Sequence, residues 1–356
     1  MTHRFPIREI ALQAGLGLAT VDRVLNNRNH VSPQTKLRVR AAIEELAARE
    51  AKTAARGRRL FFDFIVMGPD YFNHEIKTAA ESVQHQIDAA VCRPRFVQHG
   101  ILDEEGIVHA LMRILKRGSN GVCLTARDTP KIRKTVNTLS AAKIPVVTLL
   151  TDISGSDRIS YVGLDNIGAG RTAAYLVSKF VGDDSGTVLV IRNLERVLGE
   201  EERETAFVEA LADRCPQLRI LQVPNICGSS SETSKTLSNV LATVPNLCAL
   251  YSLGVGNRSI LDILEHNGLR PRLFMAHDLN QENHNLLFDQ RLDFILHHDL
   301  RSDVRNVFDA FLAYHQLSTG PVSDLVSSVQ VLTQENIPSQ VSSRKVRKAI
   351  SDGIKL

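Results

Sequence analysis

Residues 10–32 read IALQAGLGLATVDRVLNNRNHVS. Ala11, Gly15 and Val21 have the spacing of two short helices that pack through a tight turn. The small side chain of Ala11 lets the second helix approach the first, and Gly15 can adopt a turn conformation that strains other residues. Val21 then holds the second helix against the first. This stretch therefore predicts a helix-turn-helix unit.

Apolar residues with helical spacing extend this unit on both sides. A third helix is indicated by Ser32-Pro33, a capping hydroxyl followed by a proline that fits the first helical turn. Three helices in about fifty residues, with basic side chains outside, are typical of a domain that reads DNA. The apolar positions are Ile7, Ile10, Ala11 and Ala14, then Leu18, Val21, Val24 and Leu25, then Leu37, Val39, Ile43 and Leu46.

Positive charge is concentrated in the same region. Residues 1–60 contain twelve Lys or Arg and five Asp or Glu, a net charge of +7, whereas the whole chain carries +4. The remaining residues are therefore slightly acidic. A segregated basic segment suits contacts to nucleic-acid phosphates, although a basic patch alone is often only a solvated face.

The motif Thr20–Asn26, TVDRVLN, followed by His30-Val31-Ser32, resembles the DNA-binding headpiece of the LacI/GalR family of bacterial transcription regulators. The resemblance implies a DNA-binding regulator, expected to be a repressor, that acts as a homodimer on a pseudo-palindromic operator. The other interpretation of these residues is a small helical bundle without a role in DNA binding.

The resemblance also implies which headpiece residues contact DNA. The second helix, at about residues 18–26, enters the major groove, where the apolar Leu18 and Ala19 favour contacts such as a thymine methyl. Arg23 is a third base reader, and Asp22 replaces a serine that is usual in the family. The candidate backbone contacts are Thr20, Asn26, Asn29, His30 and Ser32, with Arg56 as a candidate for the minor groove.

The linker departs from the family pattern. Family members carry a hinge helix with the pattern YxPNxxARxL, whose leucine wedges into the minor groove. Residues 47–60 read AAREAKTAARGRRL and contain neither the Pro-Asn pair nor that leucine. Two interpretations stay open: a degenerate hinge, or an extension of the third helix that frays at Gly57.

The overall composition limits the class of protein. Hydrophobic residues make up 43% of the 356 residues, aromatic residues make up 5%, and there is no Trp, which fits aliphatic α/β cores. The sequence has no apolar run of membrane-spanning length and begins with polar residues, so we expect no membrane span and no secretory signal. The five cysteines are scattered, which predicts buried thiols in a reducing cytoplasm, with no metal, no cofactor and no disulfide framework.

From residue 60 onward, short apolar runs alternate with helical patterns, which predicts parallel sheets built from crossover units. The predicted strands are 60–67, 121–125, 145–150, 161–163, 187–192, 219–223, 249–253, 272–277 and 294–297. The predicted helices are 74–90, 104–117, 129–142, 166–182, 201–213, 231–243, 257–267, 280–289 and 302–317. This number of strands suggests two Rossmann-like lobes. The pattern resembles the type I periplasmic-binding-protein fold of the family's effector domain.

The predicted organisation is a small all-α helix-turn-helix domain followed by a two-lobed α/β effector domain. The boundaries are 1–50 for the DNA-binding domain, 51–60 for the linker, 61–340 for the ligand-binding and dimerisation domain, and 341–356 for a basic tail. The first lobe comprises about 61–162 and 298–322, and the second about 163–297 and 323–340.

Ligands of open parallel sheets bind at the carboxyl ends of the strands, so polar and aromatic residues at those positions are candidates. Carboxylates and arginine suit sugar hydroxyls, and an aromatic ring suits the apolar face of a sugar. The resemblance favours Arg203, which precedes Phe207 as in the family's R-x-x-G-F motif, and Asp278, which ends a strand. The candidate ligand-binding residues are Asp70, Phe72, Asn73, Asp128, Asp152, Arg203, Asn257, Asp278 and His298.

Two further patterns have simpler explanations. Gly168, Gly170 and Ala173 fit a dinucleotide-binding fingerprint, but close packing of a helix on the sheet explains these glycines better. His297-His298-Asp299 could suggest metal or acid–base chemistry, but adjacent strand residues point to opposite faces. We therefore expect no enzyme. The alternatives are a periplasmic-type solute-binding protein, which would not carry the headpiece, and a sugar-modifying enzyme, which would need a catalytic constellation.

Overall fold

The computed structural model describes residues 5–26, 28, 31–55, 58–68, 70–97, 103–193, 197–225, 231–244, 246–254, 256–320 and 322–338. Several expectations fall outside these residues: the predicted DNA contacts Asn29, His30 and Arg56, the thiol of Cys227 and the basic tail 341–356. The side chain of Asp70 is also outside the description.

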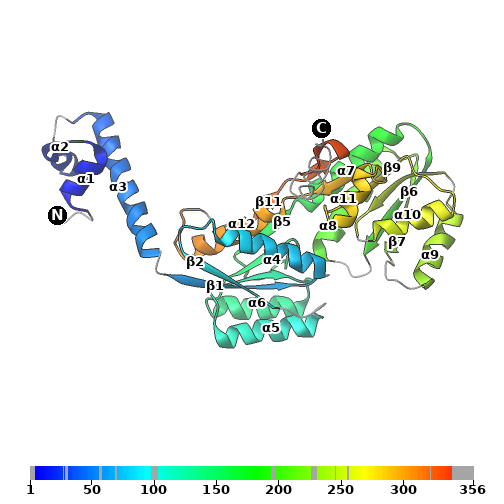
Figure 1. The fold of residues 1–356 in the computed structure, drawn as a ribbon, viewed down its shortest axis with the longest axis horizontal. Helices are drawn as coiled ribbons and strands as arrows, with labels where there is room; N and C mark the ends of the chain where they lie inside the picture. Colours follow the sequence, from blue (N-terminus) through cyan, green and yellow to red (C-terminus); the bar gives the residue numbers. More distant parts are fainter. Residues whose placement is uncertain are drawn as a thin grey trace, which may run out of the picture.

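The N-terminal domain consists of α1 (Ile7–Ala14), α2 (Leu18–Leu25) and α3 (Pro33–Ala55). Figure 1 shows α1 and α2 gathered at the N-terminal end of α3. Gly15 ends α1 in the left-handed conformation with φ of 60°, which confirms the predicted turn. The buried core comprises Phe5, Ile10, Ala11, Ala14, Val21, Val39, Ala42 and Leu46. Leu37, by contrast, is exposed.

α3 begins as predicted and ends later than the predicted domain. The hydroxyl of Ser32 accepts a hydrogen bond from the backbone N–H of Thr35 at 3.2 Å, which is an N-cap. The helix then continues to Ala55, so the expected boundary at residue 50 lies inside it. Of the two interpretations of the linker, the alanine-rich stretch 47–55 extends the third helix.

The first lobe has a parallel sheet in the order β11-β5-β4-β3-β1-β2. Helices α4 and α12 cover one face of the sheet and α5 and α6 the other (Figure 1). Its elements are β1 (Arg59–Val66), α4 (Asp70–Gln84), β2 (Val91–Phe96), α5 (Glu104–Arg117), β3 (Gly121–Thr125), α6 (Pro130–Ala141), β4 (Val146–Leu149), β5 (Ser160–Leu164), α12 (Leu300–Tyr314) and β11 (Leu325–Ser327).

The second lobe has a sheet in the order β12-β10-β9-β8-β6-β7, in which β12 alone runs antiparallel to its neighbour. Its elements are α7 (Asn166–Val181), β6 (Gly186–Asn193), α8 (Leu198–Arg214), β7 (Leu218–Asn225), α9 (Ser231–Ala242), β8 (Leu247–Ser252), α10 (Asn257–His266), β9 (Leu273–His277), α11 (Gln281–Phe288), β10 (Phe294–His297), β12 (Gln330–Leu332) and the short 3-10 helix η1 (Gln334–Asn336).

The chain crosses between the two sheets three times: from β5 to α7, from β10 to α12, and from β11 to β12. The sequence placed the last crossing at residues 322–323. This position is too early, because β11 pairs with β5 in the first sheet through Leu325, Val326 and Ser327. The three-residue strands β11 and β12 are too short to show a periodic pattern.

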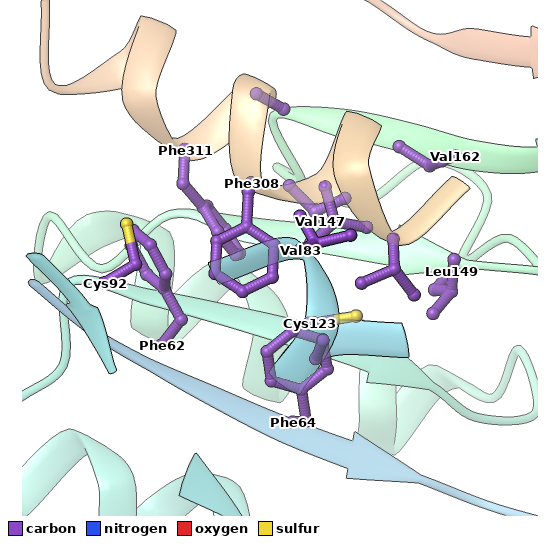
Figure 2. Close-up of a cluster of buried hydrophobic side chains, with 14 of the residues drawn as sticks. Phe62, Phe64, Val83, Cys92, Cys123, Val147, Leu149, Val162, Phe308 and Phe311 are labelled. Carbon is purple, nitrogen blue, oxygen red and sulfur yellow. The ribbon is translucent and has the colours of Figure 1, made fainter. Parts of the chain in front are cut away.

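Late-chain residues complete the core of the first lobe. Phe308 and Phe311 of α12 meet Phe62 and Phe64 of β1 in the cluster drawn in Figure 2. The rings of Phe62 and Phe311 are stacked with their centroids 4.7 Å apart. Since aromatic contacts of this kind add to the free energy of burial, α12 is a structural part of the first lobe.

Candidate functional site

The exposed face of the headpiece centres on α2. Leu18 is 54% exposed, and Ala19 and Arg23 are also exposed, as expected for residues that contact a partner. Arg8, Leu12 and Leu16 line an open hollow of about 500 Å³ together with Leu18. Arg8 and the 85% exposed Leu12 were not among the predicted contacts, because their place on α1 shows only once the two helices are packed.

Asp22 lies on α2 among cationic and amide groups. Its carboxylate accepts a hydrogen bond from the Asn26 side chain at 2.8 Å and lies 3.3 Å from a guanidinium nitrogen of Arg28. These contacts offset its negative charge near a surface that would meet phosphates. The hydroxyl of Ser32 is engaged in capping α3, and Thr20 is half-buried.

Arg203 lies on α8 and is only 8% exposed. Its Nε and Nη2 both donate to the Asn166 side-chain oxygen, at 3.2 and 2.8 Å. It is thus held from α7 rather than by the neighbouring glutamates of a solvated helix. A Cβ on Gly170 would lie 2.3 Å from the carbonyl oxygen of Arg203, so the absence of a side chain there lets α7 and α8 meet. The predicted packing of this glycine on the sheet was wrong: its partner is a helix.

Asp278 directly follows β9 and has a left-handed backbone with φ of 62°. The Asn283 side chain donates to the carbonyls of His277 and Asp278, both at 2.8 Å, and thereby holds this strained turn. Asn283 in turn accepts from Asn257 at 2.8 Å. Asn257 is fully buried, so the structure places it behind the site as a support for Asp278.

His298 lies in the segment that leaves β10 and enters α12. Its Nδ1 is 2.5 Å from a carboxylate oxygen of Asp303, and its Nε2 is 3.9 Å from a carboxylate oxygen of Asp278. Burial lowers the pKa of His298, but the hydrogen bond with Asp303 and the charges of Asp278 and Asp303 outweigh burial and raise the pKa. The protonated form of the ring therefore persists to higher pH than in an ordinary histidine.

Two buried residues extend this site and were not predicted. The hydroxyl of Tyr251 on β8 lies 2.5 Å from Nε2 of His277 on β9. Burial, followed by the charges of Arg203, His298 and His297, lowers the pKa of His277 well below its ordinary value. A neutral His277 can share a proton with Tyr251 and adds no further positive charge beside Arg203 and His298. In the sequence both residues read as ordinary strand positions.

The first lobe contributes a different set of side chains. Phe72 packs at the edge of the core, and the Asn73 amide donates to the carbonyl of Gly68 at 3.0 Å.

The two candidate aspartates of the first lobe are engaged by protein groups. Asp128 pairs with Arg133 at 2.7 Å. The carboxylate of Asp152 meets the guanidinium of Arg158 through both oxygens and also accepts from the Thr148 hydroxyl. Asp152 thus has protein partners that hold the loop after β4.

In the residues that the structure describes, metal binding would require a cluster of ligating side chains and membrane insertion a long apolar helix. Within them there is no group of three His, Cys, Asp or Glu that could hold a metal ion, and no helix long and apolar enough to cross a membrane. His297 accepts a hydrogen bond from the backbone of Leu279. The thiols of Cys92, Cys123, Cys215 and Cys248 are free and buried.

Residues 64–314 match the family model of the periplasmic binding protein domain, and residues 6–47 match that of the bacterial regulatory proteins of the lacI family. The chain belongs to the LacI/GalR family. The two matches coincide with the two structural units, the helix-turn-helix headpiece and the two-lobed α/β domain. This confirms the fold class predicted from the sequence.

Solved structures share the two-lobed fold of the α/β domain. A candidate LacI transcriptional regulator from Bacteroides fragilis has a TM-score of 0.68 and 13% identity, covering 78% of this chain and 98% of that one. A solute-binding protein from Burkholderia graminis in complex with D-arabinose has a TM-score of 0.70 and 19% identity, covering 80% and 98%. AraP, an arabinose-binding protein from Geobacillus stearothermophilus, has a TM-score of 0.65 and 20% identity, covering 78% and 97%.

A curated relative of this LacI/GalR chain is the ribose import binding protein RbsB of Salmonella typhimurium. It is 22% identical over 136 residues, which cover 38% of this chain and 45% of the relative. The chain therefore spans less than half of that relative's length. At these identities the likeness establishes the fold.

Proposed function

We propose that this protein is a DNA-binding transcription repressor whose affinity for its operator is controlled by a small sugar, polyol or sugar derivative. The observation that carries the proposal is the union in one chain of a lacI-family headpiece and a periplasmic-binding-protein domain. A protein with both units can bind DNA through one and a metabolite through the other. We place its action in the cytoplasm, where the DNA lies.

The proposed ligand contacts are those that converge at the carboxyl ends of the strands of the second lobe. Arg203 offers a guanidinium, Asp278 a carboxylate and His298 a ring nitrogen, which together can donate to and accept from vicinal hydroxyls. Phe72 and Asn73 are the proposed contacts from the first lobe. The relatives named for ribose and arabinose support a sugar as the ligand class.

The proposed DNA contacts are the exposed residues of α2, with Leu18, Ala19 and Arg23 as base readers. Thr20, Asn26, Asn29, His30 and Ser32 are the proposed backbone contacts, and Arg56 is the proposed contact in the minor groove. A single headpiece reads too few base pairs to select one site in a genome, so we propose a homodimer on a pseudo-palindromic operator. Sedimentation tests this directly: a monomer at micromolar concentration, both free and on DNA, would contradict the dimer.

The deciding experiment combines selection of duplex DNA with a thermal-shift screen of sugars on the full chain. We expect enrichment of a pseudo-palindromic sequence, and a sugar that raises the melting temperature and changes affinity for that duplex. Arg23→Gln should lose the sequence preference, while Arg219→Gln, at an exposed position of the second lobe, should not. A protein that binds a sugar but no DNA would be a solute-binding protein instead. A protein that converts the sugar would be an enzyme.

A further inference from the structure

All three crossings between the lobes lie next to the Asp303 carboxylate or to its hydrogen-bond partner. Asp303 is in the first turn of α12, just after the second crossing, and pairs with His298 within that crossing. Its other oxygen accepts from the Ser327 hydroxyl at 3.0 Å, just before the third crossing. The same hydroxyl lies 3.0 Å from the carbonyl oxygen of Gly163, so its one proton is shared between that oxygen and Asp303, and the backbone carbonyl of Ser327 accepts from the backbone N–H of Asp165, beside the first crossing.

The burial of this pair fixes the protonation of the histidine ring. Asp303 is fully buried and His298 is nearly so. A buried carboxylate 2.5 Å from Nδ1 keeps the proton on that nitrogen, because an unprotonated Nδ1 would set two acceptors against each other. Only Nε2 is then left to change its proton as the pH changes.

Nε2 points toward Asp278 across a gap that no direct hydrogen bond spans. The distance of 3.9 Å from Nε2 to the Asp278 carboxylate is too long for one. A hydroxyl oxygen between them could accept from Nε2–H and donate its own proton to Asp278. This pairing requires Nε2 to carry a proton, and the carboxylate of Asp303 stabilises that state.

We propose that Asp303 is a positioning residue for the effector site, which holds His298 as a protonated donor so that His298 and Asp278 together select a ligand hydroxyl. The inference rests on the proposed function and names the chemistry of one contact within it. Asp303 itself does not touch the ligand. His298 and Ser327, the two hydrogen-bond partners of Asp303, lie beside the three crossings. The Asp303–His298 pair therefore connects the proposed ligand contact to the segments that join the two lobes.

The groups that face His298 come from four elements besides its own segment. Asp303 lies on α12, Asp278 and His277 lie at the end of β9, Arg203 lies on α8, and His297 ends β10. The carboxylates favour the protonated ring and Arg203 opposes it. Removing the charge of Asp303 should therefore shift the balance toward a neutral ring, which cannot carry protons on Nδ1 and Nε2 together.

Histidine titration by NMR tests this without any ligand. The twelve histidines of the full chain are labelled at Cε1, and His298→Gln identifies the signal of His298. We expect a wild-type midpoint above 6.5 and a midpoint lower by about one unit or more in Asp303→Asn. Asp309→Asn, a half-exposed carboxylate on the same helix, should leave the midpoint unchanged. A wild-type midpoint at or below 6.5, or an unchanged midpoint in Asp303→Asn, overturns the proposal.

Sugar affinity as a function of pH supplies the second measurement, with D-ribose, D-arabinose and D-allose as probes. In the wild type, affinity should fall about tenfold once Nε2 gives up its proton, and in Asp303→Asn the same decrease should occur at lower pH. His298→Gln should bind more weakly and without this pH dependence, which keeps the test valid if Asp303→Asn does not fold. Equal pH dependence in the wild type and His298→Gln overturns the proposal. If none of the three sugars binds, they are excluded as effectors, while the titration still decides the role of Asp303.

Discussion

Glu75 on α4 of the first lobe lies close enough to Asp278 of the second lobe to be affected by its charge. Burial, reinforced by that charge, raises the pKa of Glu75 from its ordinary value to about 7. Glu202 on α8 is similarly affected by Asp152 and Asp165, since burial and these two charges raise its pKa. Each lobe thus carries a glutamate, Glu75 or Glu202, whose pKa is raised in part by carboxylates of the other lobe or of the crossing segment.

The raised pKa of Glu75 predicts a pH-dependent stability. Because the folded chain prefers the protonated carboxyl, the contribution of Glu75 is favourable at low pH and is lost as the pH rises from about 4.5 to about 7. Glu75→Gln should therefore raise the free energy of unfolding at pH 8 by about 1 kcal/mol, a value reduced for its partial exposure, with little change at pH 4.5. Thermal melting at the two pH values measures the difference. Equal effects at both would contradict it.

Gly170→Ala tests the contact between α7 and α8. The added Cβ would lie 2.3 Å from the carbonyl oxygen of Arg203 and 2.9 Å from the backbone nitrogen of Phe207, so a helix must move. We expect a decrease in stability of roughly 1–3 kcal/mol and weaker sugar binding, because Arg203 moves with α8. Gly320→Ala is the control, since a Cβ there meets nothing within 4 Å. Denaturant unfolding and calorimetry provide the two measurements.

Arg203→Ala removes a buried multidentate donor from the proposed ligand site. The ligand hydroxyls or carboxylate would be left without a partner, which should cost on the order of 2–4 kcal/mol of binding free energy. Arg171→Ala, at an exposed position of α7, serves as the control. Phe72→Ala should weaken the effect of the sugar on DNA binding at least as much as its affinity. Calorimetry that gives the wild-type affinity for both Arg203→Ala and Asp278→Ala would remove these two residues from the site.

The basic linker predicts a component of DNA affinity that does not depend on sequence. Neutralising Arg56, Arg58 and Arg59 together should weaken binding to every duplex. It should also reduce the slope of log affinity against log salt by about one unit for each phosphate that the linker no longer neutralises. Arg23→Gln should instead reduce the difference between selected and random duplexes. Titrations at several salt concentrations separate the two effects. A linker variant with the wild-type salt slope would rule out phosphate binding there.

The sequence predicted the fold well where local patterns were strong. The helices at 104–117 and 166–181 and the strands at 121–125 and 294–297 were found within one residue of their ends. Gly15 and Ser32 were interpreted correctly because a left-handed turn and an N-cap depend on only a few neighbouring residues. The resemblance then supplied the two-lobed arrangement.

The rest of the site depends on contacts between segments far apart in the chain. Asp303 meets Ser327 and His298 only after α12 and β11 return to the first lobe, and nothing near Asp303 in the sequence indicates this. Asn257 was predicted as a ligand contact because it follows a strand, but burial between α10 and α11 gives it a different partner. Likewise, β2 was missed because Pro94 and two arginines interrupt its apolar pattern.

Helix α3 runs without interruption from the headpiece core to Ala55, so the headpiece is carried at one end of a single helical rod. Its 23 residues span about 35 Å, and the helix is anchored in the headpiece core through Val39, Ala42 and Leu46. Each residue added to the rod beyond Leu46 would lengthen it by about 1.5 Å and rotate the reading face by about 100° about the axis. The length of the alanine-rich stretch thus sets both the distance of the headpiece along the helix axis and its rotation about that axis. In the proposed homodimer, inserting or deleting one residue there should change the preferred spacing of the two operator halves, while the proposed base-contacting residues Leu18, Ala19 and Arg23 stay the same.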